Sequence, residues 1–302
     1  MEQNSVSVII PTYRRAHLIN RAIQSVLNQT YRDFKIMVVI DGPDNDTIKV
    51  LKSIADDRIR YIIHEKNMGI SAARNTGIQS TDSKYVAFLD DDDEWAPQKL
   101  YKQVKVADDS SEDTGVIYTD VLICEDNSNT CAYFECIDGK KDTRRQIVRG
   151  RCITPSTVLV KRECFRKIGL FDTELERCED WEFWLRVSEK YKFVKVCEPL
   201  TIFHETSGQR LGPSENIEEF LEVKEVIVTK YFKRQKKLLA YNLFGLGVEW
   251  YDMKEHRRGR QLMLKSFKLD PFNPKYVVAV ATYAWPGIFH ILESFYRKHF
   301  IH

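Results

Sequence analysis

The sequence predicts an α/β fold in which a mostly parallel sheet is flanked by helices and followed by a helical C-terminal extension. Up to about residue 120, short apolar runs alternate with segments of helical periodicity, which is the pattern of successive βα units. A polar turn follows each apolar run, so each predicted strand delivers polar residues to one edge of the sheet. Beyond residue 213 the chain is helical almost throughout.

The first part of the chain is expected to alternate strands and helices. Val6–Ile10 is a predicted strand that Pro11 ends, because proline lacks the N–H group that a sheet needs. Leu18–Leu27 carries apolar residues at helical spacing and should pack that stripe on the sheet. The further elements expected here are strands at 35–40, 59–63 and 85–89 and helices at 48–54 and 71–79.

From Thr114 the pattern loosens into shorter segments, which predicts a mixed edge to the sheet. The apolar runs Val116–Thr119 and Thr157–Val160 are the expected strands of that edge. A compact helix follows with Glu179 and Asp180 in its first turn, where the helix dipole favours acidic side chains and can present them to a cleft.

The chain is expected to form two domains, residues 1–212 and the helical extension 213–302, because a Gly and Pro break at Ser207–Pro213 separates them. Residues 244–267 and the LDPFNP string loosely resemble one tetratricopeptide-like hairpin, which should pack on the first domain or on a partner. The apolar stretch Tyr276–Leu292 is short for a membrane span. It is expected to be either a buried helix or a helix in the membrane interface.

Composition excludes some classes of protein. The 302 residues include 46 basic and 44 acidic side chains, so the net charge of +2 gives no reason to expect a nucleic-acid partner. The seven cysteines form no CxxC pair and are odd in number, which predicts reduced thiols rather than a zinc site or a disulfide framework. With no secretory signal visible, we expect a cytoplasmic protein that can make peripheral contact with the inner face of the membrane.

Four consecutive aspartates, Asp90–Asp93, follow the predicted strand at 85–89. Carboxylates crowded at the end of a strand repel one another unless a cation or ligand neutralises them. An isolated acidic run is often only a solvated turn. Other motifs in this chain favour a ligand site.

Several ordered blocks over residues 5–210 together resemble glycosyltransferase family 2, the inverting enzymes of the Rossmann-like GT-A fold. The blocks are SVIIPTYRR at Ser5, IDGPDNDT at Ile40, NMGISAARNTG at Asn67, FLDDDDEW at Phe88, ITPSTVLVKRECFRKIGLFDTEL at Ile153, EDWEFWLR at Glu179 and PLTIFH at Pro199. Their order makes chance agreement far less frequent than for a single motif.

The resemblance places the nucleotide of a sugar donor at the residues that close the first strand, Pro11, Thr12 and Tyr13. There the aromatic ring can stack on a base. It also implies that Asp41 accepts a hydrogen bond from the base, although Asp41 could instead cap the turn at Gly42. Ile40 precedes Asp41 where relatives pair two acids, and Pro43 stands where serine is common, which leaves the base identity open.

The family's DxD pattern falls on Asp90 and Asp92, and the resemblance implies a Mn²⁺ or Mg²⁺ ion held with help from the donor phosphates. Asp92 is the expected metal ligand, and Asp90 should contact the ribose or a metal-bound water. Asp91 is a further donor-binding candidate, and both Asp91 and Asp93 remain alternative candidates for the roles given to Asp90 and Asp92. His204 matches a position that reaches the metal or diphosphate, but it could equally be a packed or surface residue.

Asp180 is the expected catalytic base, because an inverting transfer is a single displacement in which one carboxylate takes the proton of the acceptor hydroxyl. Glu179 could exchange roles with it or cap the helix. Cys178 stands before this pair where relatives often carry glycine. Arg74 could pair with the donor phosphates or hold an acid of the cluster. Trp181 can border the acceptor pocket.

Three other classes are weaker matches. A pyrophosphorylase should show a glycine-rich basic loop and an oxidoreductase GxGxxG after the first strand, whereas PTYRR has no glycine. A binding-only relative would not need Asp90, Asp92 and Asp180. Since QxxRW and transmembrane helices are not found, the resemblance implies a transferase that adds a single sugar. Family habit favours a UDP-sugar donor and a glycan or lipid-linked acceptor in surface polysaccharide synthesis.

Overall fold

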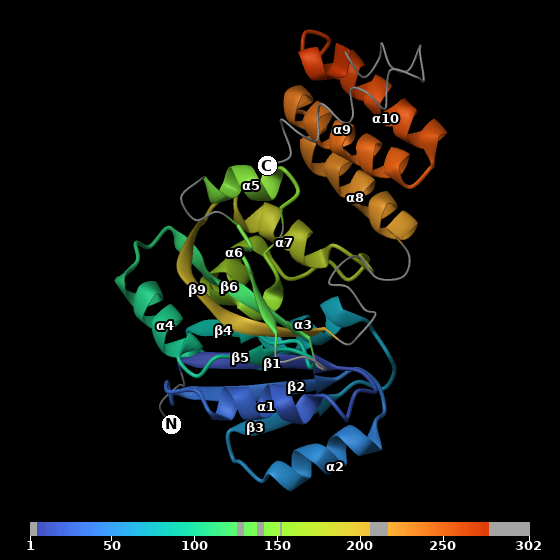
Figure 1. The fold of residues 1–302 in the computed structure, drawn as a ribbon. Coiled ribbons are helices and arrows are strands. Elements are labelled where there is room, and N and C mark those ends of the chain that lie inside the picture. Colours follow the sequence, from blue (N-terminus) through green and yellow to red (C-terminus); the bar gives the residue numbers. More distant parts are fainter. Residues whose placement is uncertain (1–4, 126–129, 138–141, 152, 206–216, 278–302) are drawn as a thin grey trace. The chain divides into compact units, whose positions relative to one another are not determined.

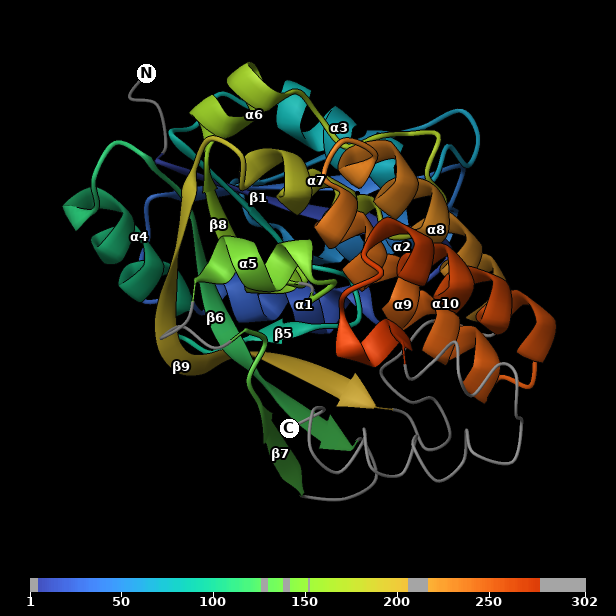
Figure 2. The ribbon, with the colours of Figure 1, turned by 90° about the horizontal axis from the view of Figure 1, so that it is seen from above.

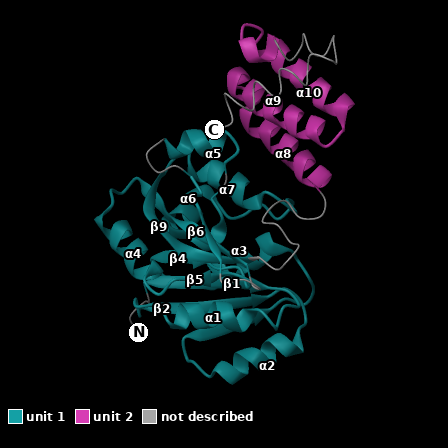
Figure 3. Ribbon diagram, in the orientation of Figure 1, with its two compact units in different colours: residues 1–211 teal, residues 212–302 magenta. Residues whose placement is uncertain are grey.

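The computed structural model describes residues 5–125, 130–137, 142–151, 153–205 and 217–277. The chain divides into two compact units, residues 1–211 and residues 212–302 (Figure 3). In the described ranges, no helix has both the length and the apolar character needed to cross a bilayer. Most of the predicted apolar stretch Tyr276–Leu292 lies outside those ranges.

The first unit is built on a mixed sheet with the strand order β3-β2-β1-β4-β8-β6-β9-β5, and β7 pairs with β6 (Figure 1). The strands are β1 Val6–Thr12, β2 Phe34–Ile40, β3 Ile59–Ile63, β4 Tyr85–Phe88, β5 Glu94–Trp95, β6 Thr114–Glu125, β7 Cys131–Phe134, β8 Val158–Lys161 and β9 Lys192–Glu205. Strands β3, β2, β1 and β4 are parallel. The predicted α/β fold is confirmed.

Helices cover both faces of this sheet (Figures 1 and 2). They are α1 Ile19–Leu27, α2 Asn45–Ile54, α3 Ile70–Gln79, α4 Lys99–Asp109, α5 Thr143–Val148, α6 Arg162–Ile168 and α7 Glu179–Val187. Val6, Val8 and Ile10 share one apolar core with α1, α2 and α4. On the opposite face, Phe88 of β4 meets Phe171 edge to face at 5.5 Å, within an aromatic cluster that includes α6 and α7. This alternation follows from the period of two along each strand.

Helix α3 lies unusually close to β1, because two glycines allow it. Gly69 precedes the helix with φ +89°, a left-handed conformation that glycine adopts readily. At Gly77, a Cβ atom would lie 2.5 Å from Cγ2 of Ile9 in β1, which is shorter than any normal contact. The small side chain therefore sets the distance between helix and sheet, and with it the position of Arg74 one turn earlier.

Two expectations about the sheet are wrong. Strand β1 does not end at Pro11 but continues to Thr12, with Pro11 opposite Val39 of β2. The proline is tolerated because pairing between β1 and β4 has already ended at Ile9 and Phe88, so its missing N–H interrupts no ladder there.

The mixed part of the sheet is not confined to an edge, because it runs from β8 at the centre to β5 at the end of the sheet. Strand β8 is antiparallel to both of its neighbours, β4 and β6, and its residues Val158, Leu159 and Val160 are fully buried. A short apolar run reads the same in an edge strand and in a central one, so the sequence pattern could not decide its place.

The second unit includes the helices α8 Ile217–Phe232, α9 Lys236–Asp252 and α10 His256–Leu269, and its described part ends in a further helical segment at 274–277. Helices α9 and α10 form a hairpin whose backbones approach closely at Gly247 and Gly259. A Cβ atom on Gly259 would lie 2.6 Å from the carbonyl oxygen of Gly247. Gly245, which the sequence motif singled out, faces open space instead, since no atom lies within 4 Å of its Cβ position.

Candidate active site

The polar turns after β1, β2 and β4 meet at one edge of the sheet. Strand β1 pairs with β2 on one side and β4 on the other, which makes its carboxyl end the point where ligands bind in open α/β sheets. Thr12 at the end of β1 donates a 2.6 Å hydrogen bond to Asp91 after β4. The ring of Tyr13 lies beside Gly42 after β2. These contacts bring together segments that are far apart in the sequence.

The four aspartates occupy different environments. Asp91 is buried and accepts hydrogen bonds from Thr12 and, at 3.0 Å, from Nη1 of Arg15. Burial raises the pKa of Asp91 to about 6, although both of these donors act in the opposite direction. Asp92 is 43% exposed and accepts at 2.8 Å from the same Nη1 atom. Asp92 is therefore the more accessible carboxylate of the two.

Ser156 ties the two ends of the acidic turn together. Its hydroxyl accepts from the backbone N–H of Asp90 at 3.1 Å and donates to the carboxylate of Asp93. Burial, together with the nearby charge of Asp90, raises the pKa of Asp93 well above its usual value. Asp93 is thus a buried residue that holds the turn together, whereas Asp90 remains 33% exposed.

Arg74 joins the acidic turn to the start of α7. Its guanidinium is buried and donates to Asp90 at 2.9 Å and to Glu179 at 2.6 Å. Burial alone would lower the pKa of Arg74, but the carboxylates of Asp90, Glu179 and Asp180 outweigh that effect and raise it. Of the two roles left open by the sequence, the structure therefore shows the second, in which arginine holds an acid of the cluster. Arg74 holds one acid of the acidic turn, Asp90, and one acid of α7, Glu179.

Helix α7 presents Asp180 in its first turn, where the sequence placed it. The carboxylate is half-buried and accepts from the backbone N–H of Trp181 at 2.7 Å. The residue before the helix, Cys178, has φ +58°, a left-handed conformation that disfavours side chains. A glycine would adopt this backbone conformation without strain. Trp181 does not border a pocket, since it is 3% exposed and donates to the carbonyl of Ile147 at 2.8 Å.

Asp41 is a fastening for the loop that leads into α3. Its carboxylate accepts from Nδ1 of His64 and the backbone N–H of Met68, both at 2.8 Å, and from the N–H of Gly69 at 2.9 Å. Two of these bonds go to Oδ1 and one to Oδ2. A carboxylate has about four acceptor sites, so Oδ2 keeps one for a further donor. Asp41 is 5% exposed, and in this structure it holds the loop.

The remaining donor candidates lie beside this carboxylate. Pro11 and Thr12 are buried within β1. Tyr13 is 40% exposed directly after the strand, with the guanidinium of Arg14 located 5.2 Å from its ring centroid. Of these three residues, Tyr13 alone offers an exposed ring for stacking on a base.

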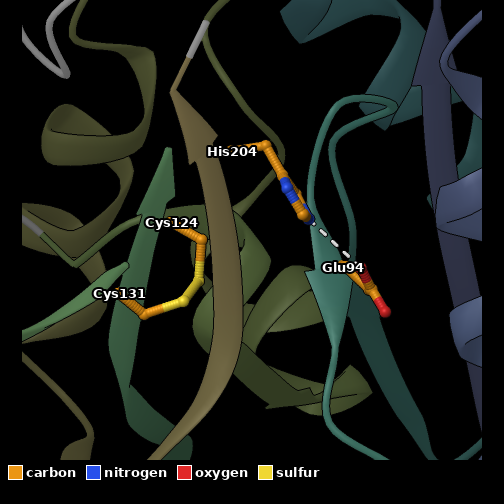
Figure 4. The surroundings of a disulfide bond; sticks show 4 residues. All are labelled: Glu94, Cys124, Cys131 and His204. Atoms are coloured by element: carbon orange, nitrogen blue, oxygen red, sulfur yellow. Dashed lines mark hydrogen bonds and ion pairs between the residues drawn. A yellow bond between two sulfur atoms is a disulfide. The ribbon is translucent and has the colours of Figure 1, made fainter. Parts of the chain in front are cut away.

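His204 lies on β9 and pairs with Glu94 of β5, the residue directly after the acidic turn. The two side chains are 3.1 Å apart, and Figure 4 shows the imidazole directed at that carboxylate. His204 therefore lies close in space to the end of the acidic turn, although it is 110 residues from Glu94 in the sequence. In this structure its imidazole pairs with the carboxylate of Glu94.

The expectation that all cysteines are reduced is wrong. Cys124 of β6 and Cys131 of β7 form a disulfide, which lies near His204 (Figure 4). The two residues are direct cross-strand partners with Cα atoms 4.2 Å apart. A spacing of seven residues gave no recognisable motif, because only the hairpin brings these residues opposite each other. The cysteine count therefore no longer argues for a reducing compartment.

The acidic turn suits a divalent cation that brings further ligands with it. Among the described residues, no three His, Cys, Asp or Glu side chains are grouped so that they could hold an ion. Mg²⁺ and Mn²⁺ are usually held by one or two carboxylates plus substrate phosphates. The oxygens of Asp90 and Asp92 are exposed and hard, and a positive guanidinium already lies against Asp92. These donors fit such a cation.

The sequence profile described as "Glycosyl transferase family 2" matches residues 7–169, more than half of the chain. The chain belongs to glycosyltransferase family 2. This confirms that the protein is an enzyme of the transferase class, and the blocks carrying Asp41, Arg74 and Asp90–Asp93 lie within the matched residues.

Relatives of this transferase include an uncharacterized glycosyltransferase of Methanocaldococcus jannaschii, 29% identical over 84% of this chain and 82% of its own length. A relative from Rickettsia felis matches 94% of this chain but only 46% of its own length. The Escherichia coli protein named UDP-Glc:alpha-D-GlcNAc-diphosphoundecaprenol beta-1,3-glucosyltransferase WfgD is 30% identical over 62% of this chain and 71% of its own.

Solved structures share the fold of the transferase. S. aureus TarS in complex with UDP superposes with a TM-score of 0.67 at 17% identity, covering 92% of this chain and 87% of that one. A mannosyltransferase from Pyrobaculum calidifontis, in complex with GDP-Man and Mn²⁺, gives a TM-score of 0.58 at 14% identity, with 97% and 83% covered. Together they confirm the GT-A fold.

Three contacts of the transferase were missed by sequence reasoning: Arg15 on the aspartates, Ser156 between the ends of their turn, and His64 beneath Asp41. Arg15 and Ser156 stand inside recognised blocks, in PTYRR and ITPST. A basic residue three positions after the strand-ending threonine was a usable signal. His64 gave none, because a lone histidine after a strand has no pattern.

Proposed function

We propose that this chain is an inverting, metal-dependent glycosyltransferase that moves a single sugar from a UDP-sugar to a hydroxyl of a glycan or lipid-linked acceptor in surface polysaccharide synthesis. The observation that carries the proposal is the convergence at Arg74. One buried guanidinium contacts an acid of the donor turn, Asp90, and an acid of the catalytic motif, Glu179, which are 89 positions apart by their numbers in the sequence. The donor and acceptor motifs thus belong to one site.

The choice of UDP rests on similarity. WfgD is named for a UDP-glucose donor and a diphosphoundecaprenol-linked acceptor, and TarS has been solved with UDP and with UDP-GlcNAc. In this chain, Tyr13 offers a ring for the base, and the remaining acceptor site on Oδ2 of Asp41 suits a ring N–H donor. Uracil presents one such N–H group.

Asp180 is the proposed catalytic base. The acceptor hydroxyl oxygen forms a bond to the anomeric carbon while the bond from that carbon to the diphosphate oxygen breaks on the opposite face, so the configuration inverts. The hydroxyl proton passes to the Asp180 carboxylate, and the electron pair of the broken bond remains on the diphosphate. The guanidinium of Arg74 lies among the acids Asp90, Glu179 and Asp180, whose charges raise its pKa, so it places a positive charge beside the proposed base.

Asp92 would hold the cation together with oxygens of the donor, and Asp90 would contact the ribose or a cation-bound water. When bound, a divalent cation supplies positive charge that stabilises the departing diphosphate. The half-exposed carboxylate of Asp92 is the protein's contribution, and Asp91 and Asp93 keep the turn in place from below. His204 is proposed to assist only after its pairing with Glu94 opens.

A two-variant comparison tests the assignment. Asp180→Asn should lower transfer at least 100-fold while the Kd for UDP with Mn²⁺ changes less than threefold, because general-base catalysis contributes about 10²–10⁴-fold. Asp92→Asn should weaken Mn²⁺-dependent UDP binding about tenfold or more. Asp46→Asn, an exposed acid of α2, is the matched control and should change neither quantity.

Donor binding is measured by isothermal titration calorimetry and transfer by release of UDP from a panel of UDP-sugars. Full turnover by Asp180→Asn would remove Asp180 from the base role. A wild-type protein that binds no uridine nucleotide, with or without Mn²⁺, would refute the proposed donor.

A further inference from the structure

A positive side chain already lies where the acidic turn is expected to meet a cation. Nη1 of Arg15 is 3.0 Å from Asp91 and 2.8 Å from Asp92, so one nitrogen serves two carboxylates. The contact with Asp91 is nearly buried on the acid's side, since that side chain is 5% exposed, whereas Asp92 and Arg15 are 43% and 49% exposed. The inner half of this bridge is enclosed and the outer half is open to solvent.

The backbone directs Arg15 to this place. Arg14, the residue before it, has φ +54°, a left-handed conformation that costs a residue with a side chain on the order of 1 kcal/mol. The resulting turn brings Arg15 back to Asp91, the same carboxylate that Thr12 contacts from the end of β1. Such local strain persists only where surrounding contacts maintain it. The position of Arg15 is therefore built into the turn.

Arg15 and a divalent cation cannot share Asp92 without repulsion. Both are positive, and a carboxylate oxygen 2.8 Å from a guanidinium would have to accept a second cation beside it. Since half of the Arg15 side chain is exposed, it can leave Asp92. The nearest new anion would be the diphosphate of the arriving donor, and guanidinium groups bind phosphate oxygens in a bidentate manner.

We propose that Arg15 exchanges partners during donor binding: it neutralises Asp92 in the free protein and pairs with the donor diphosphate in the complex. This inference rests on the proposed function, because it requires a nucleotide diphosphate donor. Arg15 thereby weakens the binding of a cation to the turn before the nucleotide arrives. It makes the binding of cation and donor depend on each other.

The test uses Arg15→Gln in the full chain, with Lys49→Gln as the control that removes one positive charge from the exposed surface of α2. Binding of Mn²⁺ alone is measured by electron paramagnetic resonance of the free ion. Binding of UDP at saturating Mn²⁺ is measured by calorimetry. Arg15→Gln should bind Mn²⁺ alone about threefold more tightly, because an exposed ion pair is lost. It should bind UDP about tenfold more weakly, because a charge-assisted hydrogen bond is lost.

These opposite changes distinguish a residue that exchanges partners from a residue with a structural role. Replacing a structural residue would weaken the binding of both ligands. Arg15→Lys should retain wild-type Mn²⁺ affinity and part of the UDP affinity, since it keeps the charge but not the planar fork. Equal Mn²⁺ affinity of wild type and Arg15→Gln, or unchanged UDP affinity, would overturn the inference. The failure of the proposed function looks different: wild type itself would then bind no UDP in the presence of Mn²⁺.

Discussion

Replacing Arg74 by methionine gives the sharpest test of how the active site is held together. The guanidinium is 3% exposed and pairs with Asp90 and Glu179. Removing one partner of a buried ion pair costs about 3–5 kcal/mol, because the other charge is left uncompensated. Here most of that penalty falls on Glu179, which is 12% exposed. Asp90, at 33% exposure, can be rehydrated and should add less than about 1 kcal/mol.

We therefore expect Arg74→Met to lower the free energy of unfolding by about 4 kcal/mol. The double variant Arg74→Met/Glu179→Gln should recover about 2 kcal/mol of this loss, because the stranded charge is gone. The measurement is urea unfolding followed by tryptophan fluorescence, with the midpoints compared at equal slope. Lys192→Met is the control. Its pair with Asp113 lies at the surface, where the two side chains are 70% and 47% exposed, and should contribute less than about 1 kcal/mol.

A loss smaller than about 1 kcal/mol for Arg74→Met would show that the two acids do not depend on this arginine. A double variant no more stable than the single one would refute the role of the stranded Glu179 charge. Either result would remove the physical link between the donor turn and α7.

Three further predictions concern other parts of the first unit. Cys178→Gly should raise the free energy of unfolding by about 0.5 kcal/mol in thermal or urea unfolding, because glycine adopts φ +58° without strain; a destabilised variant would contradict this. Burial lowers the pKa of Lys99 well below its usual value, so the native state binds fewer protons than the unfolded state, and the free energy of unfolding of the wild type should rise with pH up to about 10. Lys99→Met should lose this rise. Equal pH dependence of the two proteins would refute the prediction. Thiol titration of the protein unfolded without reductant should count five of the seven cysteines if Cys124 and Cys131 are joined, whereas seven thiols would exclude the bond.

Local chemistry made much of the fold predictable from the sequence. The strand at Ile59–Ile63 was predicted with its observed bounds, and α3 began only one residue earlier than expected, because turn residues and apolar periodicity mark these ends. The family was recognisable because its motifs are short and ordered along the chain. Acidic residues at Asp90–Asp93 could be assigned to a site on the same basis.

Pairing between distant segments could not be predicted. The full length of β6, Thr114–Glu125, depends on its long contact with β9, and neither strand shows that partner in its own sequence. The division of labour within the acidic turn was equally hidden, since Asp91 and Asp92 differ only in what surrounds them. Burial and tertiary hydrogen bonds decide these roles, and a motif records only the residue types.

The close approach of α3 to β1 has a consequence for how mutational scans of this enzyme should be interpreted. Gly77 contacts no proposed substrate group, yet a methyl there would meet the stiff, branched side chain of Ile9 at 2.5 Å and push the helix outward. Arg74 would move with it. A mutational scan that measures turnover would thus place Gly77 among the chemically active positions, although Gly77 contributes only by having no side chain.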